Sequence, residues 1–298
     1  MGKISGSLLT LDKPTTGGIS LSSAPRGPDL AEKHRDYAAM STILNTEAAV
    51  VRVVRRIADS YPPAIAAVQR YIDVPRTAFN LSLLFALPRG ARIGDIGGGL
   101  GLFSPSCSAL GFDVTLVDDF GGAWQKTVAE DVFDRVHRPF GVKIVRRDIV
   151  AEGVEFEPET FDAFTIFDTI EHWHNSPKRV LHQLMAALKP GGLFIISSPN
   201  CVNLRKRITV PFGIGKWTLM QDWYEVEKFR SHVREPDVAD LRYIAADLGL
   251  ENARVIGRNW SGYRSRFRAA RLVIPLIDRM LRFRPSLCSD IYLVGRKG

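Results

Sequence analysis

The sequence has few cysteines and no long apolar run, and these absences exclude several classes of protein. Its three cysteines, Cys107, Cys201 and Cys288, are odd in number and widely spaced, and no C-x-x-C pair suggests zinc or redox chemistry. Nowhere do roughly 18 apolar residues follow one another, and Lys3 is not followed by the apolar run of a signal peptide. We therefore expect a protein of the reducing cytoplasm that neither spans a membrane nor carries an export signal.

Acidic residues are scarce in one segment only. The chain has 298 residues, with 40 Lys and Arg against 32 Asp and Glu, for a net charge of +8. Residues 258–298 contain ten basic and two acidic residues, whereas residues 1–257 contain 30 of each. Because the excess is local, nucleic acid is a less favoured partner than a small molecule. With 45% hydrophobic and 24% charged residues, the composition is that of an ordinary globular enzyme.

The first part of the chain differs in pattern from the rest. Residues 1–28 are rich in Ser, Gly, Thr and Pro without apolar periodicity, which predicts a flexible leader. Residues 29–88 carry apolar residues at helical spacing, interrupted at Pro62-Pro63 and at Pro75. We expect two or three N-terminal helices here.

Residues 89–298 form the main domain, in which short runs rich in Val and Ile alternate with longer segments of helical period. Such alternation requires crossover connections, so we expect an α/β fold with a doubly wound, mostly parallel, seven-stranded sheet. An insert at residues 200–235 and a basic segment at residues 258–298 interrupt the pattern. The predicted strands are Ala91–Ile96, Asp113–Val117, Val142–Val145, Ala163–Phe167, Leu193–Ser197, Ala253–Arg258 and Ile291–Gly295.

A Gly-rich turn follows the first predicted strand. Residues 94–101 read Gly-Asp-Ile-Gly-Gly-Gly-Leu-Gly, at the strand end where open α/β sheets bind ligands. Asp118 ends the next strand, where a carboxylate can accept the hydroxyls of a ribose. The dinucleotide pattern fails because it requires glycine where Leu102 stands, and because Asp95 would repel a pyrophosphate. The same negative charge favours a cationic sulfonium nucleoside.

These features resemble the class I S-adenosylmethionine-dependent methyltransferases over roughly residues 89–298. Asp95–Gly101 is similar to the first motif of that family, and Arg147-Asp148-Ile149 to the segment that contacts the adenine. Phe161–His172 and Leu188–Gly192 are similar to the fourth strand and to the turn before the fifth. The resemblance implies a Rossmann-like fold and S-adenosylmethionine as methyl donor. The donor contacts that it implies come from Asp95, Gly97, Gly99, Gly101, Asp118, Asp148, Ile149 and Phe167.

Asp168, Glu171 and His172 suggest chemistry for a hydroxyl acceptor, which must lose its proton to a base or to a metal. If a helical turn follows the fourth strand, these three side chains converge. They suit Mg2+ or another divalent cation, and their spacing resembles metal-binding subgroups of the family, namely ubiquinone-biosynthesis O-methyltransferases and small-RNA 2′-O-methyltransferases. Three roles stay open for them: metal ligation, general base catalysis by His172, or a structural role.

A second histidine, His232, lies in the segment Ser231–Glu235. In small-molecule and polysaccharide branches of the family, a similar segment follows an insert that covers the acceptor. Aromatic rings stack on sugars, and Asn and Arg donate hydrogen bonds to hydroxyls or anions. The insert residues of these kinds here are Asn203, Arg205, Lys206, Arg207, Trp217, Trp223 and Tyr224. Both histidine segments follow strand ends, so Glu171, His172 and His232 are the candidate catalytic residues.

These patterns lead us to expect an O-methyltransferase that modifies a hydroxyl of a saccharide, a glycolipid or a similar polyhydroxylated small molecule. Two alternatives remain, an RNA methyltransferase and a donor-binding scaffold without turnover. If Tyr263–Phe283 is one helix, it carries a stripe of five arginines, Arg264, Arg268, Arg271, Arg279 and Arg282. Such a helix could pack on the sheet or on a second copy of the chain, contact an anionic membrane peripherally, or bind phosphates of a nucleic acid or a charged glycan.

Overall fold

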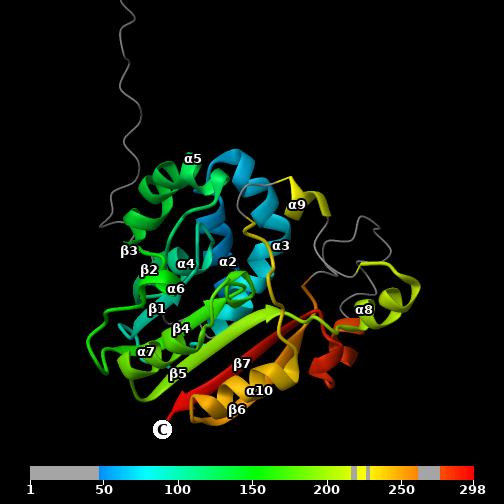
Figure 1. The fold of residues 1–298 in the computed structure, drawn as a ribbon. Coiled ribbons are helices and arrows are strands. Elements are labelled where there is room, and N and C mark those ends of the chain that lie inside the picture. Colours follow the sequence, from blue (N-terminus) through cyan, green and yellow to red (C-terminus); the bar gives the residue numbers. More distant parts are fainter. Residues whose placement is uncertain (1–46, 216–219, 226–228, 261–275) are drawn as a thin grey trace, which may run out of the picture.

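The computed structural model describes residues 47–215, 220–225, 229–260 and 276–298, and a seven-stranded sheet runs through its centre (Figure 1). The strand order is β3-β2-β1-β4-β5-β7-β6. The predicted leader and the start of the predicted helical segment lie outside the described residues. The strands are β1 Arg92–Ile96, β2 Asp113–Asp118, β3 Lys143–Arg146, β4 Phe161–Phe167, β5 Leu188–Pro199, β6 Leu250–Arg258 and β7 Asp290–Lys297.

The sheet is parallel from β3 through β5, and β7 runs antiparallel to both β5 and β6. This confirms the predicted mostly parallel, doubly wound fold. Because β1, β2 and β4 are parallel, the loops at their carboxyl ends lie along one edge of the sheet. Strand β5 begins five residues before the predicted strand, since Leu188 already pairs with Phe161 and a register shift follows before Ala163 pairs with Leu193.

Helices cover both faces of the sheet (Figure 1). Alternate strand residues point to opposite faces, so Ile93 packs in one core cluster and Ile96 in the other. The first cluster takes side chains from α2 Glu47–Ala58, α3 Pro63–Ser82, α4 Phe103–Ala109 and α5 Ala123–Val132. The second takes them from α6 Ile149–Glu152, α7 Lys178–Ala187 and α10 Val238–Asp247. The short helices α8 Leu204–Thr209 and α9 Met220–Tyr224 belong to the insert.

The predicted break at Pro62-Pro63 is confirmed, because α2 ends before it and Pro63 opens α3. The predicted break at Pro75 is wrong, since this proline lies inside α3. Neighbouring residues of α3, such as Val74 and Ala78, are buried in the core, and tertiary packing outweighs the local penalty of the proline. The turn between α2 and α3 also contacts the Gly-rich loop, because the Tyr61 hydroxyl donates a 2.7 Å hydrogen bond to the Gly101 carbonyl.

Only the end of the predicted Arg-rich helix lies in the described residues. Residues 276–281 are helical, and Arg282 and Phe283 fall in the turn that follows. Of the five arginines predicted to form the stripe, Arg279 and Arg282 are described. In the described part of the chain, no helix has the length and apolar character needed to cross a bilayer. All three cysteines are free.

Candidate functional site

The loop after β1 is held tightly against the end of β4. Gly97 has φ of +69°, donates a 2.7 Å hydrogen bond to the Val117 carbonyl, and accepts one of 3.1 Å from the Thr169 hydroxyl. A Cβ at Gly97 would lie 2.1 Å from Thr169 Cγ2. Glycine is therefore required here both for the left-handed backbone and for close contact with Thr169.

Gly97→Ala is expected to lower both thermal stability and affinity for the expected donor, S-adenosylmethionine, the latter at least about tenfold. The matched control is Gly90→Ala, because Gly90 has φ of +77° but a Cβ added there would meet nothing within 4 Å. Both variants place an alanine in the left-handed backbone conformation, which lowers the stability of the fold by roughly 1–2 kcal/mol. Only Gly97→Ala adds the overlap with Thr169. Thermal melting and calorimetry measure the two effects, and wild-type donor affinity in Gly97→Ala would contradict the expectation.

Asp95 lies beneath the loop rather than on its surface. It is 1% exposed, and its carboxylate accepts hydrogen bonds of 2.6 Å from the Ser104 hydroxyl and 3.0 Å from the Thr165 hydroxyl. Burial raises the pKa of Asp95 to about 6, against the lowering effect of these two hydroxyls. The carboxylate thus ties β1, β4 and α4 together directly under the Gly-rich loop. Its predicted contact with the donor stays a prediction.

The raised pKa of Asp95 makes stability depend on pH. An unfolded aspartate loses its proton near pH 4, whereas the folded protein keeps it to about pH 6, so stability falls as pH rises through this window. At pH 7 the ionised Asp95 lowers the free energy of unfolding by roughly 3 kcal/mol. Since an asparagine side chain does not titrate, the melting temperature of Asp95→Asn relative to the wild type should rise by a few degrees between pH 5 and pH 7. Asp131→Asn, on the exposed side of α5, should show no such change; a pH-independent difference for Asp95→Asn would refute the assignment.

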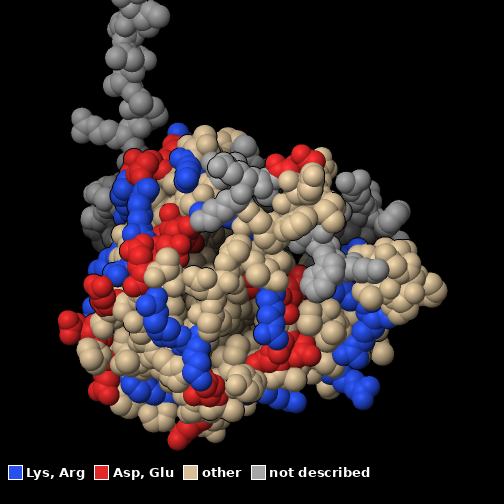
Figure 2. Space-filling model, viewed as in Figure 1, with Lys and Arg blue, Asp and Glu red and all other residues tan. Residues whose placement is uncertain are grey.

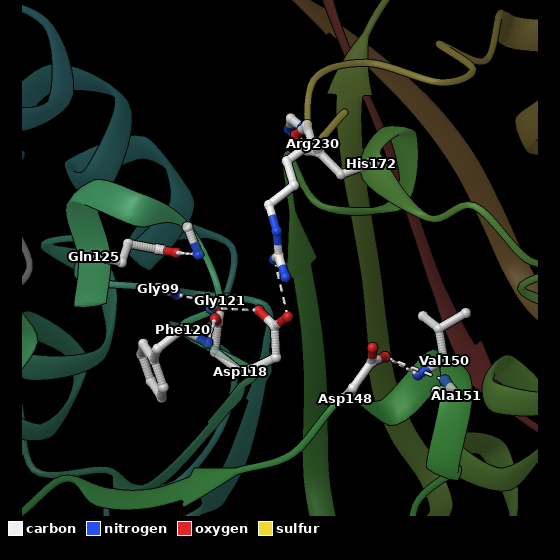
Figure 3. Close-up of polar contacts among 12 residues, drawn as sticks. Gly99, Asp118, Phe120, Gly121, Gln125, Asp148, Val150, Ala151, His172 and Arg230 are labelled. Atoms are coloured by element: carbon white, nitrogen blue, oxygen red, sulfur yellow. Dashed lines mark hydrogen bonds and ion pairs between the residues drawn. The ribbon is translucent and has the colours of Figure 1, made fainter. Parts of the chain in front are cut away.

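Asp118 closes β2 beside the loop (Figure 3). One carboxylate oxygen accepts a 3.0 Å hydrogen bond from the Gly99 amide, and the other accepts a 2.7 Å bond from the Phe120 amide. Burial raises the pKa of Asp118 to about 6. Because a carboxylate can accept about four hydrogen bonds, capacity remains on each oxygen for a ribose hydroxyl. The Gly-rich loop and this acid therefore fit a bound nucleoside.

The remaining predicted donor contacts lie nearby on the same edge of the sheet. Asp148 caps α6, since one of its oxygens accepts hydrogen bonds from the Val150 and Ala151 amides (Figure 3). Ile149 is buried in the second core cluster. Phe167 packs edge to face on Phe103, with ring centroids 4.9 Å apart. The predicted contact of Asp148 with the adenine would use the oxygen that does not cap the helix.

A second cluster follows β4. Glu171 and His172 lie in the short 3-10 turn Ile170–His172, and His232 reaches them from the end of the insert. Each of the three offers one ligand atom, and these atoms all lie within 4.8 Å of one another. The backbone holds the segments together, because the Val233 and Arg234 amides donate to the Glu171 carbonyl at 2.7 and 3.2 Å.

The group whose ligand atoms lie within 4.8 Å of one another contains Glu171, His172 and His232 but not Asp168, so the predicted metal contact of Asp168 stays a prediction. Asp168 adopts φ of +46° and its carboxylate forms an ion pair with Arg76 of α3, and both residues line the same cavity as Glu171 and His172. A regular helical turn would have brought the three side chains together, but the chain is not helical at this residue. His232 is the third member of this group, and its predicted catalytic role stays a prediction.

Hydrogen bonds orient both imidazoles. His172 Nδ1 lies 2.9 Å from the Arg230 carbonyl and His232 Nδ1 lies 2.7 Å from the Glu235 carboxylate, so in both neutral rings Nδ1 is the donor and Nε2 carries the free lone pair. Burial lowers the pKa of His172, whereas the hydrogen bond to Glu235 raises the pKa of His232. The rings meet edge to face at 4.8 Å.

Glu171 is the most unusual residue of the cluster. It is fully buried, and neither carboxylate oxygen accepts a hydrogen bond from the described part of the chain. Burial raises its pKa to about 7, although its own backbone, the neighbouring His232 and the nearby Ser198 hydroxyl lower it. A buried carboxyl group without partners is unfavourable for stability. Such a carboxyl group has the capacity to accept a ligand or a proton.

Arg230 connects the two clusters (Figure 3). Its guanidinium lies 2.9 Å from a carboxylate oxygen of Asp119, the neighbour of Asp118, while its backbone carbonyl orients His172. Gly121 leaves room for this side chain, because a Cβ there would lie 2.3 Å from the guanidinium. No motif in the sequence marked Arg230, and only the pairing of segments 111 residues apart shows its position.

A cavity of about 1610 Å3 extends from Glu171, His172 and His232 toward the insert and the C-terminal segment. It exceeds the roughly 300–1,000 Å3 of a typical small-molecule site. Of the predicted insert residues, Asn203, Arg205 and Lys206 line it. Trp223 and Tyr224 do not; they lie in α9 and are 56% and 73% exposed, and Trp217 lies outside the described residues.

The parallel sheet, the Gly-rich loop and the acid that ends β2 are features of the class I S-adenosylmethionine-dependent methyltransferase fold. The chain belongs to the methyltransferase domain family, which it matches over residues 69–255. The fold is similar to that of Haemonchus contortus phosphoethanolamine N-methyltransferase 2 in complex with S-adenosyl-L-methionine, with a TM-score of 0.50 and 17% identity over 89% of this chain and 60% of that one. At this identity the similarity shows the fold alone.

Two curated relatives share the sequence of the core. The ubiquinone biosynthesis O-methyltransferase of Xanthomonas campestris pv. campestris is 33% identical over 115 residues, which are 39% of this chain and 45% of that protein. The mitochondrial ubiquinone biosynthesis O-methyltransferase of Schizosaccharomyces pombe is 31% identical over 123 residues, or 41% and 42% of the two chains. The chain thus spans less than half the length of these relatives.

Proposed function

We propose that the protein transfers a methyl group from S-adenosylmethionine to a hydroxyl of a polyhydroxylated small molecule. The observation that carries this proposal is the buried, unpartnered Glu171 beside two oriented imidazoles. The cluster is adjacent to the donor loop, since Thr169, two residues before Glu171, bonds to the Gly97 carbonyl. The names of the two curated relatives, both O-methyltransferases, support a hydroxyl acceptor.

Two clusters of residues have different roles, one in binding the donor and the other in removing the proton of the acceptor. Bound S-adenosylmethionine supplies a methyl group that its sulfonium already activates toward displacement. The loop Gly97–Gly101 and Asp118 would hold the nucleoside, so that the acceptor is aligned from the opposite side. His172 and His232 each present Nε2 as an acceptor, and either can take the proton of the hydroxyl. Arg230 and Glu235 fix the orientation of these rings.

The same three side chains fit a divalent cation. One carboxylate and two imidazoles suit a cation of borderline hardness. In both imidazoles the Nδ1–H donates a hydrogen bond, to a backbone carbonyl in one and to a carboxylate in the other, as the second nitrogen of metal-bound histidines commonly does. Glu171, His172 and His232 would hold the ion. A bound cation would lower the pKa of the acceptor hydroxyl.

Chelation is expected to abolish turnover without abolishing donor binding. Exhaustive treatment with EDTA should leave calorimetric affinity for S-adenosylmethionine unchanged and reduce methyl transfer at least about 100-fold, and a divalent cation should restore it. Mg2+ and Mn2+ are tested separately, because imidazole ligands favour the softer ion. Undiminished turnover after chelation would leave His172 or His232 as the base and remove the metal from the proposal.

The cavity favours a glycolipid or another amphiphilic hydroxylated molecule over a free saccharide. The lining combines the buried Glu171 and the partly buried His232 with the apolar side chains of Ile208, Ile277 and Leu281, and Ile208 and Ile277 are 57% and 46% exposed. The test incubates the purified protein and labelled S-adenosylmethionine with cell extract, before and after lipid extraction, glycosidase or ribonuclease treatment. Label in a lipid-soluble, ribonuclease-resistant product is expected. Label that ribonuclease removes would support an RNA methyltransferase, and no donor binding would defeat the function altogether.

We also place the protein in a reducing, cytoplasmic compartment, which its three free thiols support.

A further inference from the structure

Two segments that flank the cavity expose large apolar side chains. In residues 204–214, Ile208, Phe212 and Ile214 are 57%, 77% and 61% exposed. In residues 276–283, Met280 and Phe283 are 65% and 86% exposed. Monomeric proteins rarely expose so many large apolar side chains within a small area.

These segments lie side by side. The Arg207 guanidinium donates a 3.2 Å hydrogen bond to the Ser286 carbonyl, and Ile208 and Ile277 line the same cavity. Figure 1 shows α8 beside the red C-terminal helix, and Figure 2 shows the same region as a protruding knob free of charged residues at its tip, with Lys and Arg beneath it. We call the exposed surface of residues 204–214 and 276–284 the apolar-basic face.

The charge of this face is positive. Residues 203–215 contain Arg205, Lys206 and Arg207 and no acidic residue. Residues 276–287 contain three arginines and a single acid, Asp278, which is 1% exposed and bonded to Arg282 and Asn259. Glu235, the last residue of the insert, forms an ion pair with Lys206. In the described part of the chain, Arg205, Arg279 and Arg284 form no ion pair and are free to meet anions.

We propose that the apolar-basic face docks on a lipid bilayer that contains anionic lipid. Aromatic and aliphatic tips flanked by arginines are suited to insertion at the boundary between headgroups and acyl chains, with the guanidinium groups at the phosphates. Nucleic acid fits less well, because Phe212 and Phe283 protrude between the cations and would stay unburied on a phosphate backbone. Docking would also bring the mouth of the cavity to the membrane. The proposal does not depend on the proposed methyl transfer.

The test is flotation of the full chain with phosphatidylcholine vesicles that contain or lack phosphatidylglycerol. Binding to the anionic vesicles is expected, at least about tenfold stronger than to neutral ones, and it should weaken as salt is raised. The double variant Phe212→Ser, Phe283→Ser should lose at least about tenfold of this binding, as should Arg279→Glu, Arg284→Glu. Tyr243→Ser is the matched control, because Tyr243 is 75% exposed on α10, outside the face, and its variant should bind as the wild type does.

Calorimetry with S-adenosylmethionine on the same preparations separates docking from the proposed function. Variants that bind the donor normally but not the vesicles establish the face independently of turnover. The proposal is overturned if neither vesicle binds the wild type, if neutral and anionic vesicles bind equally, or if the variants bind as the wild type does. Binding to RNA in place of vesicles would likewise overturn the proposal. It would indicate that the arginines contact the phosphates of a nucleic acid.

Discussion

Asp118→Ala is expected to weaken S-adenosylmethionine binding about 100-fold. In its proposed role the carboxylate accepts the hydroxyls of the ribose, and each hydrogen bond to a charged acceptor contributes about 1.5–3 kcal/mol. The substitution also frees the Gly99 and Phe120 amides, which now donate to this carboxylate, so the loop loses an anchor as well. Isothermal titration calorimetry with the purified chain measures the loss.

Asp113→Ala is the matched control. Asp113 begins the same strand that Asp118 ends, so it lies at the opposite edge of the sheet, and its carboxylate pairs with Lys143 on the surface. Exposed ion pairs contribute little, and donor affinity should stay within about twofold of the wild type. Equal affinities in the wild type, Asp113→Ala and Asp118→Ala would remove Asp118 from the donor site, and with it the proposed position of the nucleoside.

The fold is largely predictable because short strands alternate with helical segments along the chain, and this alternation is visible in the sequence. Strands β1 and β4 are short and mostly buried, and β1 is followed by the Gly-rich loop and β4 by Asp168. Antiparallel β7 was also found as a run, Ile291–Gly295, although periodicity alone does not indicate direction. The break predicted at Pro75 is wrong because the local effect of proline is visible in the sequence, whereas the core contacts of α3 that compensate for it are not.

The donor half of the site was more predictable than the acceptor half. Gly97 and Asp118 each end a neighbouring parallel strand, so topology alone brings them together. Asp168 is not among the three close ligand groups, because its φ of +46° breaks the helical spacing on which that prediction depends. Arg76 and Arg230 were not identified at all. Their positions depend on ion pairs between segments far apart in the chain, and local spacing carries no signal for such contacts.

His172→Ala is expected to reduce methyl transfer about 100- to 10,000-fold while leaving donor affinity unchanged. Its Nε2 faces the cluster, and no other described group replaces it except His232, so His232→Ala should have an effect of similar size. Because the two rings act on one proton or one cation, the double variant should lose little more than either single variant. His174→Ala is the control, since His174 is exposed and its ring lies beside Phe229. Rates with saturating labelled donor measure each variant.

Glu171→Gln distinguishes a functional cluster from a structural one. The carboxylate is buried without a hydrogen-bond partner, so removing its charge relieves an unfavourable burial, and the melting temperature should stay the same or rise. Turnover should nevertheless fall at least about 100-fold, because glutamine neither binds a cation as carboxylate does nor shares a proton with His232. A structural glutamate would give the opposite pattern, a lower melting temperature with turnover per folded molecule preserved. An active-site residue can lower the stability of the fold when catalysis needs it. A residue with only a packing role has no such reason to lower stability.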